Sequence, residues 1–203
     1  KNAEFFYRNN LKFPPEMFRG KKLIDFGAGT GENTVYLAKW GADSVRCNIG
    51  GGSICSTRIQ TGHGIPTFQS VLECSRSQYD AILVADGGIK ASGDIVKALA
   101  AGADVVMVGS LLSGTYETPG SITHPPGKPP QKVYRGMASP EAQLNWRGRY
   151  SSNEGVSRTV DVKGPVVPVL YELDKGIRSG LSYSGAKNIR ALQMKAEFII
   201  QTP

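Results

Sequence analysis

The segment from Tyr79 to Gly88 is an almost continuous apolar run that closes at Asp86 and two glycines. Hydrophobicity that is continuous instead of alternating is typical of a strand buried on both faces of a parallel sheet. Such a strand reaches its parallel neighbour through a crossover connection, which is usually a helix. The run therefore predicts an α/β fold.

Four βα units are recognisable from the periodicity of the apolar residues. The expected strands cover 22–26, 44–49, 79–88 and 104–109. The expected helices cover 32–40, 67–75 and 93–101, the last with Ser92 as its cap.

The second half of the chain is less regular. Between residues 111 and 164 the prolines predict a loop-like segment without regular structure. Helices over 165–173 and 186–195 and a short closing strand over 198–201 are expected to complete the fold.

A glycine-rich turn that ends in a thiol follows the second expected strand, from Asn48 to Arg58. Three consecutive glycines, 50–52, allow the backbone to approach a ligand, and they free N–H groups that can converge on phosphate oxygens. Ser53 adds a hydroxyl donor, and Cys55 adds a nucleophile. The turn therefore predicts a site where an anion and a thiol meet.

Composition limits the function classes. A chain of 203 residues with 40% hydrophobic content can bury a core, and its net charge of +7 comes from scattered lysines and arginines. Scattered charge favours phosphorylated metabolites over nucleic acid as partners. Three cysteines without CxxC spacing indicate neither a disulfide framework nor a zinc site. We expect a cytoplasmic protein that binds neither nucleic acid nor a membrane.

The pattern Gly-x-Gly-Ser-Ile-Cys-x-Thr-Arg from Gly50 to Arg58, followed by Thr61-Gly62, resembles the catalytic cysteine loop of the IMP dehydrogenase/GMP reductase family. The resemblance continues through 43–203 in a series of short motifs: Asp86–Lys90, Ser92–Ala103, Gly109-Ser110, Tyr134–Met137, Glu154-Gly155, Lys163-Gly164 and Gly176–Gly180. It implies the C-terminal portion of a TIM-type barrel with a flap over 111–164. Four βα units make half of such a barrel, which needs about 250 residues.

The resemblance also implies a site for a purine nucleoside monophosphate such as IMP or GMP. Asp86 would bind the ribose hydroxyls, and Glu154 would bind the purine edge. The residues that would hold the 5′-phosphate are Ser53, Gly88, Gly109 and Ser110. Those that would line the base pocket are Tyr134, Gly136 and Met137. Backbone carbonyls that would bind a monovalent cation such as potassium belong to Gly50, Gly52 and Cys55.

In the implied reaction Cys55 attacks purine C2, and hydride is exchanged with NAD or NADP. Thr57 would help to handle water or ammonia at that carbon. Arg149 and Tyr150 match a pair that activates water in the dehydrogenases. The short separation of Met137 from Glu154 is more like GMP reductase, and the direction of the reaction stays open.

The first 42 residues resemble a different family. Leu23 to Gly31 matches the first motif of S-adenosylmethionine-dependent methyltransferases, in which a strand leads into a glycine-rich turn. The residues that would bind that cofactor are Asp25, Gly27, Gly29 and Gly31. The second expected strand ends without the acidic residue that such an enzyme needs. The two resemblances together imply a chimeric chain, in which a Rossmann-like βα unit over 1–42 is joined to a half-barrel over 43–203.

Two alternatives stand beside a purine nucleotide oxidoreductase. One is a methyltransferase-like protein, and the other is a half-barrel that binds nucleotides without catalysis. Cys55 could be a buried small hydrophobe, and Asp86 could serve only to close a turn. Cys47 and Cys74 are expected to be inert. Because half a barrel leaves strand edges open, we expect a homo-oligomer.

Overall fold

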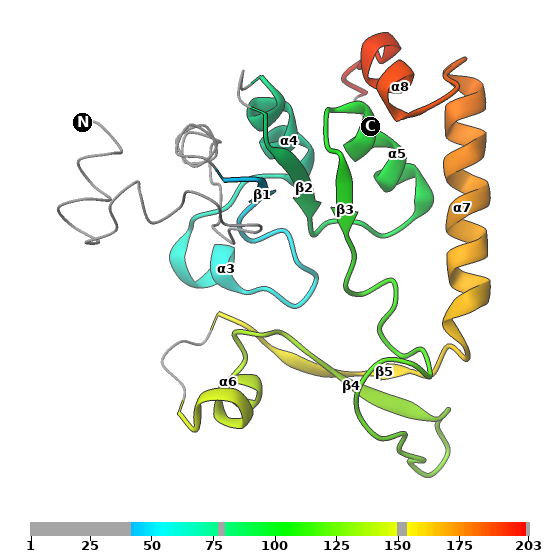
Figure 1. The fold of residues 1–203 in the computed structure, drawn as a ribbon. Helices are drawn as coiled ribbons and strands as arrows, with labels where there is room; N and C mark the ends of the chain where they lie inside the picture. The colour runs from blue at the N-terminus through cyan, green and yellow to red at the C-terminus, as the bar shows by residue number, and fades with distance from the viewer. Residues whose placement is uncertain (1–41, 77–79, 150–153, 202–203) are drawn as a thin grey trace, which may run out of the picture.

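The protein is described here by a computed structural model that covers residues 42–76, 80–149 and 154–201. Its sheet has three parallel strands in the order β1 (Ser44–Cys47), β2 (Ile82–Asp86) and β3 (Val105–Met107), as Figure 1 shows. The register places Val45 beside Leu83 and Ala85 beside Val106. The predicted α/β class with parallel strands is confirmed.

The central strand explains why the apolar run predicted the fold. Leu83, Val84 and Ala85 are consecutive, so their side chains alternate between the two faces of the sheet, and all three are buried. Burial on both faces requires apolar residues at each position. The outer strands are shorter than predicted: β1 ends at Cys47 and β3 at Met107.

Two helices follow the first two strands and pack on the sheet. Helix α4 spans Thr67–Ser75, as predicted, and contributes the buried Val71 and Cys74 to the core. Helix α5 spans Ser92–Ala100, so Ser92 is its first residue instead of its cap. The side chain of Asp94 accepts hydrogen bonds from the backbone N–H groups of Lys90 and Ala91 and stabilises this start. The predicted core positions Ile95, Leu99 and Ala103 are buried.

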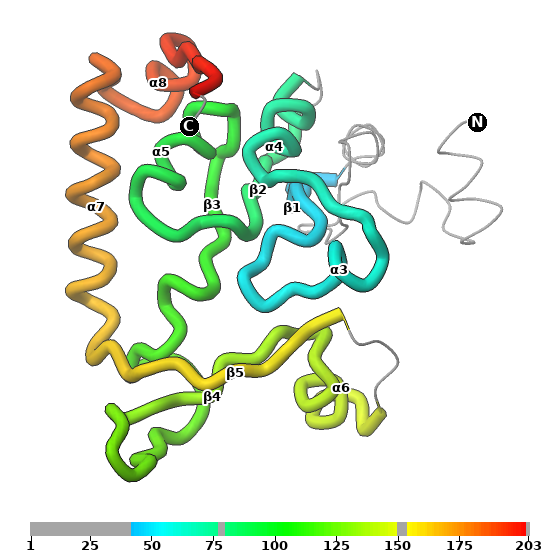
Figure 2. The backbone as a smooth tube through the Cα atoms, turned by 180° about the vertical axis from the view of Figure 1, so that it is seen from behind, coloured from blue at the N-terminus to red at the C-terminus, as the bar shows by residue number. Residues whose placement is uncertain are grey.

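The segment 111–164 was wrongly predicted to lack regular structure. It contains β4 (Gln131–Arg135), α6 (Pro140–Arg147) and β5 (Ser157–Asp161), and the two strands pair antiparallel. Both strands begin after the proline cluster, and their stability comes from pairing across the sequence, which local propensity does not reveal. Figures 1 and 2 show this ribbon lying beyond the lower ends of the parallel strands.

The buried side chain of Lys132 on β4 fixes the segment that precedes the ribbon. Its ammonium group donates hydrogen bonds to the carbonyl oxygens of Thr115, Tyr116 and Thr118. Three acceptors compensate the cost of burying this charge. The ribbon is thereby tied to the turn that follows β3.

Helix α7 spans Val166–Tyr183, ten residues beyond the predicted end at Leu173, because two glycines do not interrupt it. A Cβ atom at Gly180 would lie 2.6 Å from the Val96 side chain, and one at Gly176 would collide with Ser92. The glycines therefore allow α7 to approach α5 closely, and Figure 2 shows the two helices next to each other.

The C-terminal elements differ from the prediction at both boundaries. Helix α8 spans Ile189–Lys195 and begins after Asn188, whose side chain accepts a hydrogen bond from the Ala191 N–H. No strand forms over 198–201; Phe198 instead packs edge-on against Phe68, with ring centroids 4.8 Å apart. None of the described helices has the length and apolar content required to cross a bilayer. The predicted βα unit within 1–41 lies outside the described residues.

Candidate functional site

Asn48 connects the glycine-rich turn to the neighbouring strand. Its side-chain N–H₂ donates hydrogen bonds to Thr67 Oγ1 and to the Asp86 carbonyl, both at 2.7 Å. Its side-chain oxygen accepts from the Ile49 N–H at 2.6 Å. Asn48 adopts a φ of 127°, which asparagine tolerates better than most residues. This one side chain holds the turns after β1 and β2 together.

The two turns are in backbone contact. Gly87 has a φ of +81°, and a Cβ atom there would lie 2.8 Å from the Gly51 carbonyl carbon and 2.9 Å from the Gly52 nitrogen. A Cβ atom at Gly51 would in turn lie 2.7 Å from Thr67 Oγ1. Only glycine fits these positions, and so the turns present bare backbone to the space beside them.

Cys55, Thr57 and Glu154 form a continuous line of hydrogen bonds. The Cys55 thiol donates to Thr57 Oγ1 at 3.2 Å, and the Thr57 hydroxyl donates to Glu154 Oε2 at 2.8 Å. Short helix α3 (Thr57–Thr61), which the sequence analysis did not predict, begins at this threonine. The line places a nucleophile, a hydroxyl and a carboxylate side by side.

The backbone fixes this arrangement across almost one hundred residues of sequence. The Ser56 N–H donates to the Glu154 carbonyl at 2.8 Å, and the Val156 N–H donates to the Ile54 carbonyl at 3.1 Å. Cys55 and Gly155 thus form an isolated antiparallel bridge. The segment 111–164 therefore brings Glu154 to the cysteine loop.

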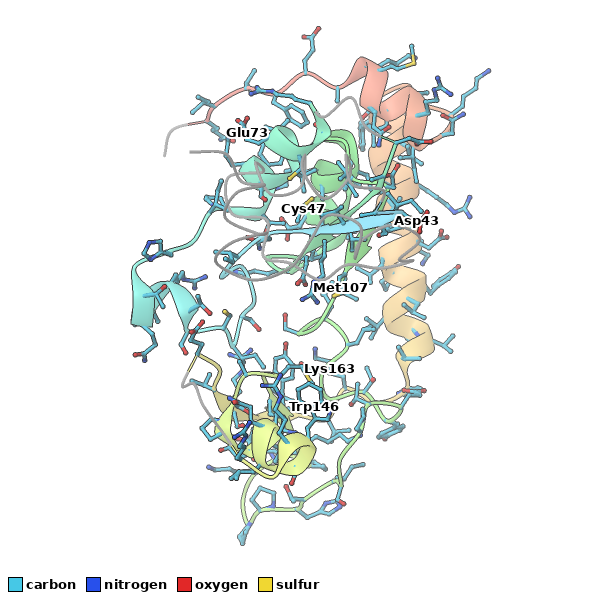
Figure 3. The ribbon with its side chains drawn as sticks, turned by 60° about the vertical axis from the view of Figure 1, so that its left-hand side comes forward. Asp43, Cys47, Glu73, Met107, Trp146 and Lys163 are labelled. Carbon is cyan, nitrogen blue, oxygen red and sulfur yellow. The ribbon has the colours of Figure 1, made fainter. Side chains whose placement is uncertain are left out.

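A cavity of about 1000 Å³ lies at the carboxyl ends of the parallel strands. Its lining includes eight of the residues predicted to bind substrate or cation: Gly50, Gly52, Ser53, Asp86, Gly88, Gly109, Ser110 and Tyr134. In Figure 3 Met107, which also lines the cavity, lies on the sheet side, and Lys163 lies on the ribbon side. The volume is at the upper end of the range for small-molecule sites.

Asp86 is the acidic side chain among the described residues that line this cavity. Its carboxylate forms an ion pair with Arg46 at 3.5 Å, and about a third of its side chain is exposed. The Arg46 guanidinium also donates to Met107 Sδ at 3.4 Å. Asp86 is therefore held at the sheet edge with room left for further acceptor contacts.

The far end of the cavity is built from the turn after β3 and from the ribbon. The Tyr134 hydroxyl approaches Gly109 so closely that a Cβ atom there would lie 2.8 Å from it. The Lys163 ammonium donates to the carbonyl oxygens of Ser110 and Leu111, at 2.9 and 3.0 Å. Burial, together with the positive charge of Arg158, lowers the pKa of Lys163.

Some predicted site residues lie elsewhere. Gly136 packs on the cysteine loop, where a Cβ atom would lie 3.5 Å from the Ile54 carbonyl oxygen, but it does not line the cavity. Met137 is 74% exposed, and Arg149 is exposed just after α6; neither lines the cavity. Tyr150 lies outside the described residues, as do the four predicted S-adenosylmethionine contacts between 25 and 31.

Two of the three carbonyl oxygens predicted to bind a monovalent cation, those of Gly50 and Gly52, already have protein donors. The Arg58 guanidinium donates to the Gly50 carbonyl at 2.7 Å, and the Cys55 N–H donates to the Gly52 carbonyl at 3.1 Å. Each carbonyl oxygen has two lone pairs and so retains one acceptor position. Among the described residues no cluster of three His, Cys, Asp or Glu side chains could hold a metal ion.

The other two cysteines are unsuited to chemistry. Cys47 and Cys74 are fully buried, and their mutual hydrogen bond, together with burial, raises the pKa of Cys47. A thiol whose pKa is raised is poorly nucleophilic because the thiolate is the reactive form. The partly exposed Cys55 is thus the accessible thiol.

Sequence reasoning missed Asn48, Thr67 and Arg158. Asn48 and Thr67 act through long-range hydrogen bonds to a turn 19 or more residues away. Arg158 reaches the cavity because β5 places it opposite Tyr134. The β-branched and aromatic residues of β4 and β5 were the available signal, and the neighbouring prolines obscured it.

The chain is similar to proteins of one known family over most of its length. A family model described as the IMP dehydrogenase / GMP reductase domain matches residues 18–203. The chain is 45% identical to the inosine-5′-monophosphate dehydrogenase of Aquifex aeolicus over 87% of the chain and 38% of that protein. It is 41% identical to the corresponding dehydrogenase of Nitrosopumilus maritimus, covering 98% of the chain and 44% of that protein.

A GMP reductase is also among the similar proteins. The enzyme named GMP reductase from Leishmania major is 41% identical over 87% of the chain and 39% of its own length. The chain thus spans well under half the length of the relatives it matches.

The fold agrees with a solved structure. A crystal structure of a Trypanosoma brucei GMP reductase variant in complex with guanosine 5′-monophosphate matches 93% of the chain and 41% of that protein, with a TM-score of 0.86 and 39% identity. The chain therefore has the fold of part of a TIM-type barrel.

Proposed function

Because the chain belongs to the IMP dehydrogenase/GMP reductase family, we propose that it takes part in the oxidation or reduction of a purine nucleoside monophosphate at C2. The observation that carries this proposal is the chain of hydrogen bonds from Cys55 through Thr57 to Glu154, in a loop whose residues Ser53 and Arg58 line a cavity with glycine-rich walls. The thiol can add to a ring carbon as a nucleophile, and the hydroxyl and the carboxylate beside it can transfer the proton that the reaction releases or consumes.

Binding of the nucleotide is assigned to the cavity. The Asp86 carboxylate would accept hydrogen bonds from the ribose hydroxyls, and bare backbone at Gly88 and Gly109 would donate to phosphate oxygens. Ser53 and Ser110 would add hydroxyl donors. Tyr134 would form part of the wall, and Gly136 and Met137 would lie against the base.

Cys55 would form a covalent bond to C2 of the purine. In the oxidative direction the thiolate adds to C2, a hydride leaves C2 with its electron pair, and water then displaces the thiolate. In the reductive direction ammonia leaves C2, a hydride is added there, and the thiolate is expelled. The nicotinamide cofactor, when bound, accepts or supplies this hydride. The relatives include both dehydrogenases and a reductase, so the direction is not assigned.

Thr57 and Glu154 would move the protons that accompany these steps. The Thr57 hydroxyl lies between the thiol and the carboxylate, so it can accept a proton on one side while it donates on the other. Glu154 would take up the proton released from water or supply the one that ammonia needs. Arg149 and Tyr150 are proposed to approach this line when the substrate is bound.

Potassium is the proposed monovalent cation at the carbonyl oxygens of Gly50, Gly52 and Cys55. Backbone oxygens are ligands that such hard cations prefer. The ion would share the Gly50 oxygen with Arg58, which already donates to it. Measuring nucleotide affinity at increasing concentrations of potassium chloride, with lithium chloride as the comparison salt, tests this site.

Calorimetric titration of the purified chain with IMP, GMP, NADH, NADPH and S-adenosylmethionine tests the proposed function. We expect IMP or GMP to bind, and replacement of Cys55 by alanine to abolish any hydride transfer while the nucleotide still binds. Binding of S-adenosylmethionine alone would favour the methyltransferase alternative. Absence of nucleotide binding at millimolar concentration by a folded sample would refute the proposal.

A further inference from the structure

Arg158 is a basic side chain at the cavity that neither the sequence motifs nor the proposed reaction uses. It lies on β5 opposite Tyr134 of β4, and both residues line the cavity. Its guanidinium carbon lies 5.8 Å from the centroid of the Tyr134 ring, within the range of a cation–π contact. The aromatic ring therefore supports the guanidinium at the cavity wall.

No carboxylate neutralises this guanidinium within the part of the chain that the structure describes. The ion pairs among the described residues involve other arginines and lysines, and Arg158 instead lies over the ring of Tyr134. An arginine presents five donors in a planar fork that matches carboxylate and phosphate oxygens. An unpaired fork at a cavity wall is available for an anionic ligand.

The charge of Arg158 acts at the end of the cavity where the turn after β3 lies. It contributes to the lowered pKa of Lys163, whose ammonium donates to the Ser110 carbonyl at 2.9 Å. The Tyr134 ring beneath Arg158 reaches the same turn, because its hydroxyl contacts Gly109. Arg158 thus lies over the ring of Tyr134, whose hydroxyl reaches Gly109 in the turn after β3.

The balance of charge around the cavity favours an anion. Arg58, Lys90 and Arg158 line it, whereas its carboxylate, Asp86, is already paired with Arg46. A surplus of positive charge in a partly enclosed space raises the local concentration of anionic ligands.

We propose that Arg158 binds the 5′-phosphate of the nucleotide directly and sets the preference of the site for monophosphates over nucleosides. This inference rests on the proposed function, since the bound ligand is the same purine nucleotide. The guanidinium would pair bidentately with two phosphate oxygens, while the backbone of Gly109 and the Ser110 hydroxyl bind the remaining oxygens. The β4–β5 ribbon would then contact the phosphate through Arg158 as well as position Glu154.

The test compares GMP, guanosine and inorganic phosphate as ligands for the wild-type chain and for Arg158→Ala, Arg158→Lys and Arg147→Ala. Arg147 is the matched control because its guanidinium also lies over an aromatic ring, that of Trp146 at 4.3 Å, but away from the cavity lining. Circular dichroism and thermal melting establish that each variant is folded.

We expect Arg158→Ala to weaken GMP about ten- to hundredfold, as loss of a charged hydrogen-bonding partner does. Guanosine affinity should stay within about threefold, because a neutral ligand does not use the guanidinium. The GMP affinity of Arg158→Lys should lie between those of the wild type and Arg158→Ala, since lysine keeps the positive charge but lacks the planar fork of donors. Arg147→Ala should bind all three ligands as the wild type does.

Two results would overturn the inference. Unchanged GMP affinity in Arg158→Ala would show that the guanidinium does not touch the phosphate. Equal weakening of guanosine and GMP would show that Arg158 only supports Tyr134. If neither nucleotide nor nucleoside binds the wild type, the proposed function fails. Inorganic phosphate then tests Arg158 by itself. Loss of phosphate binding in Arg158→Ala would support the contact, and equal phosphate binding in the variant and the wild type would contradict it.

Discussion

Replacing Gly87 by alanine tests the close contact between the two glycine-rich turns. The residue has a φ of +81°, which costs a non-glycine residue about 1–2 kcal/mol. The new Cβ atom would also lie 2.8 Å from the Gly51 carbonyl carbon, a backbone atom that cannot rotate away. Overpacking of this kind costs about 1–3 kcal/mol, so the free energy of unfolding should fall by roughly 2–5 kcal/mol.

Gly127 offers the matched control. It has a φ of +68°, and a Cβ atom there would meet nothing within 4 Å. Gly127→Ala should therefore show the conformational cost alone, about 1–2 kcal/mol. Urea unfolding followed by circular dichroism measures both variants, and GMP titration measures whether the cavity survives. If Gly87→Ala were no more destabilising than Gly127→Ala, the turns would not be packed as described.

Two further substitutions test the nucleotide site. Asp86→Ala should weaken IMP or GMP binding by about 1.5–3 kcal/mol, because a charged hydrogen-bond acceptor is lost. Asp161→Ala is the control, because Asp161 ends β5 and does not line the cavity, and it should leave binding unchanged. Equal effects of the two substitutions in calorimetry would contradict the ribose assignment. Glu154→Gln should lower turnover at least tenfold, because an amide does not act as a general base. Nucleotide affinity should change less than threefold, because glutamine keeps the size of the side chain. Thr57→Ser, which keeps the hydroxyl, should retain most of the activity in the same assay, and loss equal to that of Glu154→Gln would argue against a role for the hydroxyl.

Local sequence patterns predicted the parallel part of the fold because each element there is defined by its own residues. The apolar run around Leu83 to Ala85 is buried on both faces, and helix α4 has the predicted bounds. Helix α7 was predicted too short because glycine usually destabilises helices. At Gly180 the small residue instead permits contact with α5, which only the folded structure reveals.

The candidate site was predictable where one segment contains it and less so where distant segments meet. The loop from Gly50 to Cys55 contains both its glycines and its thiol. The contribution of Glu154 followed from a family resemblance, and the structure brings it within 2.8 Å of Thr57 Oγ1. Arg158 could not be foreseen, because its place at the cavity depends on the antiparallel register of the ribbon.

The central claim is that Cys55 is the reactive thiol of a purine nucleotide site. Its most direct test is the rate of iodoacetamide labelling of each cysteine, measured by peptide mass spectrometry with and without IMP or GMP. We expect Cys55 to react first, because Cys47 and Cys74 are fully buried, and we expect nucleotide to slow its labelling. Equal labelling of the three thiols, or labelling of Cys55 that nucleotide does not change, would contradict the account.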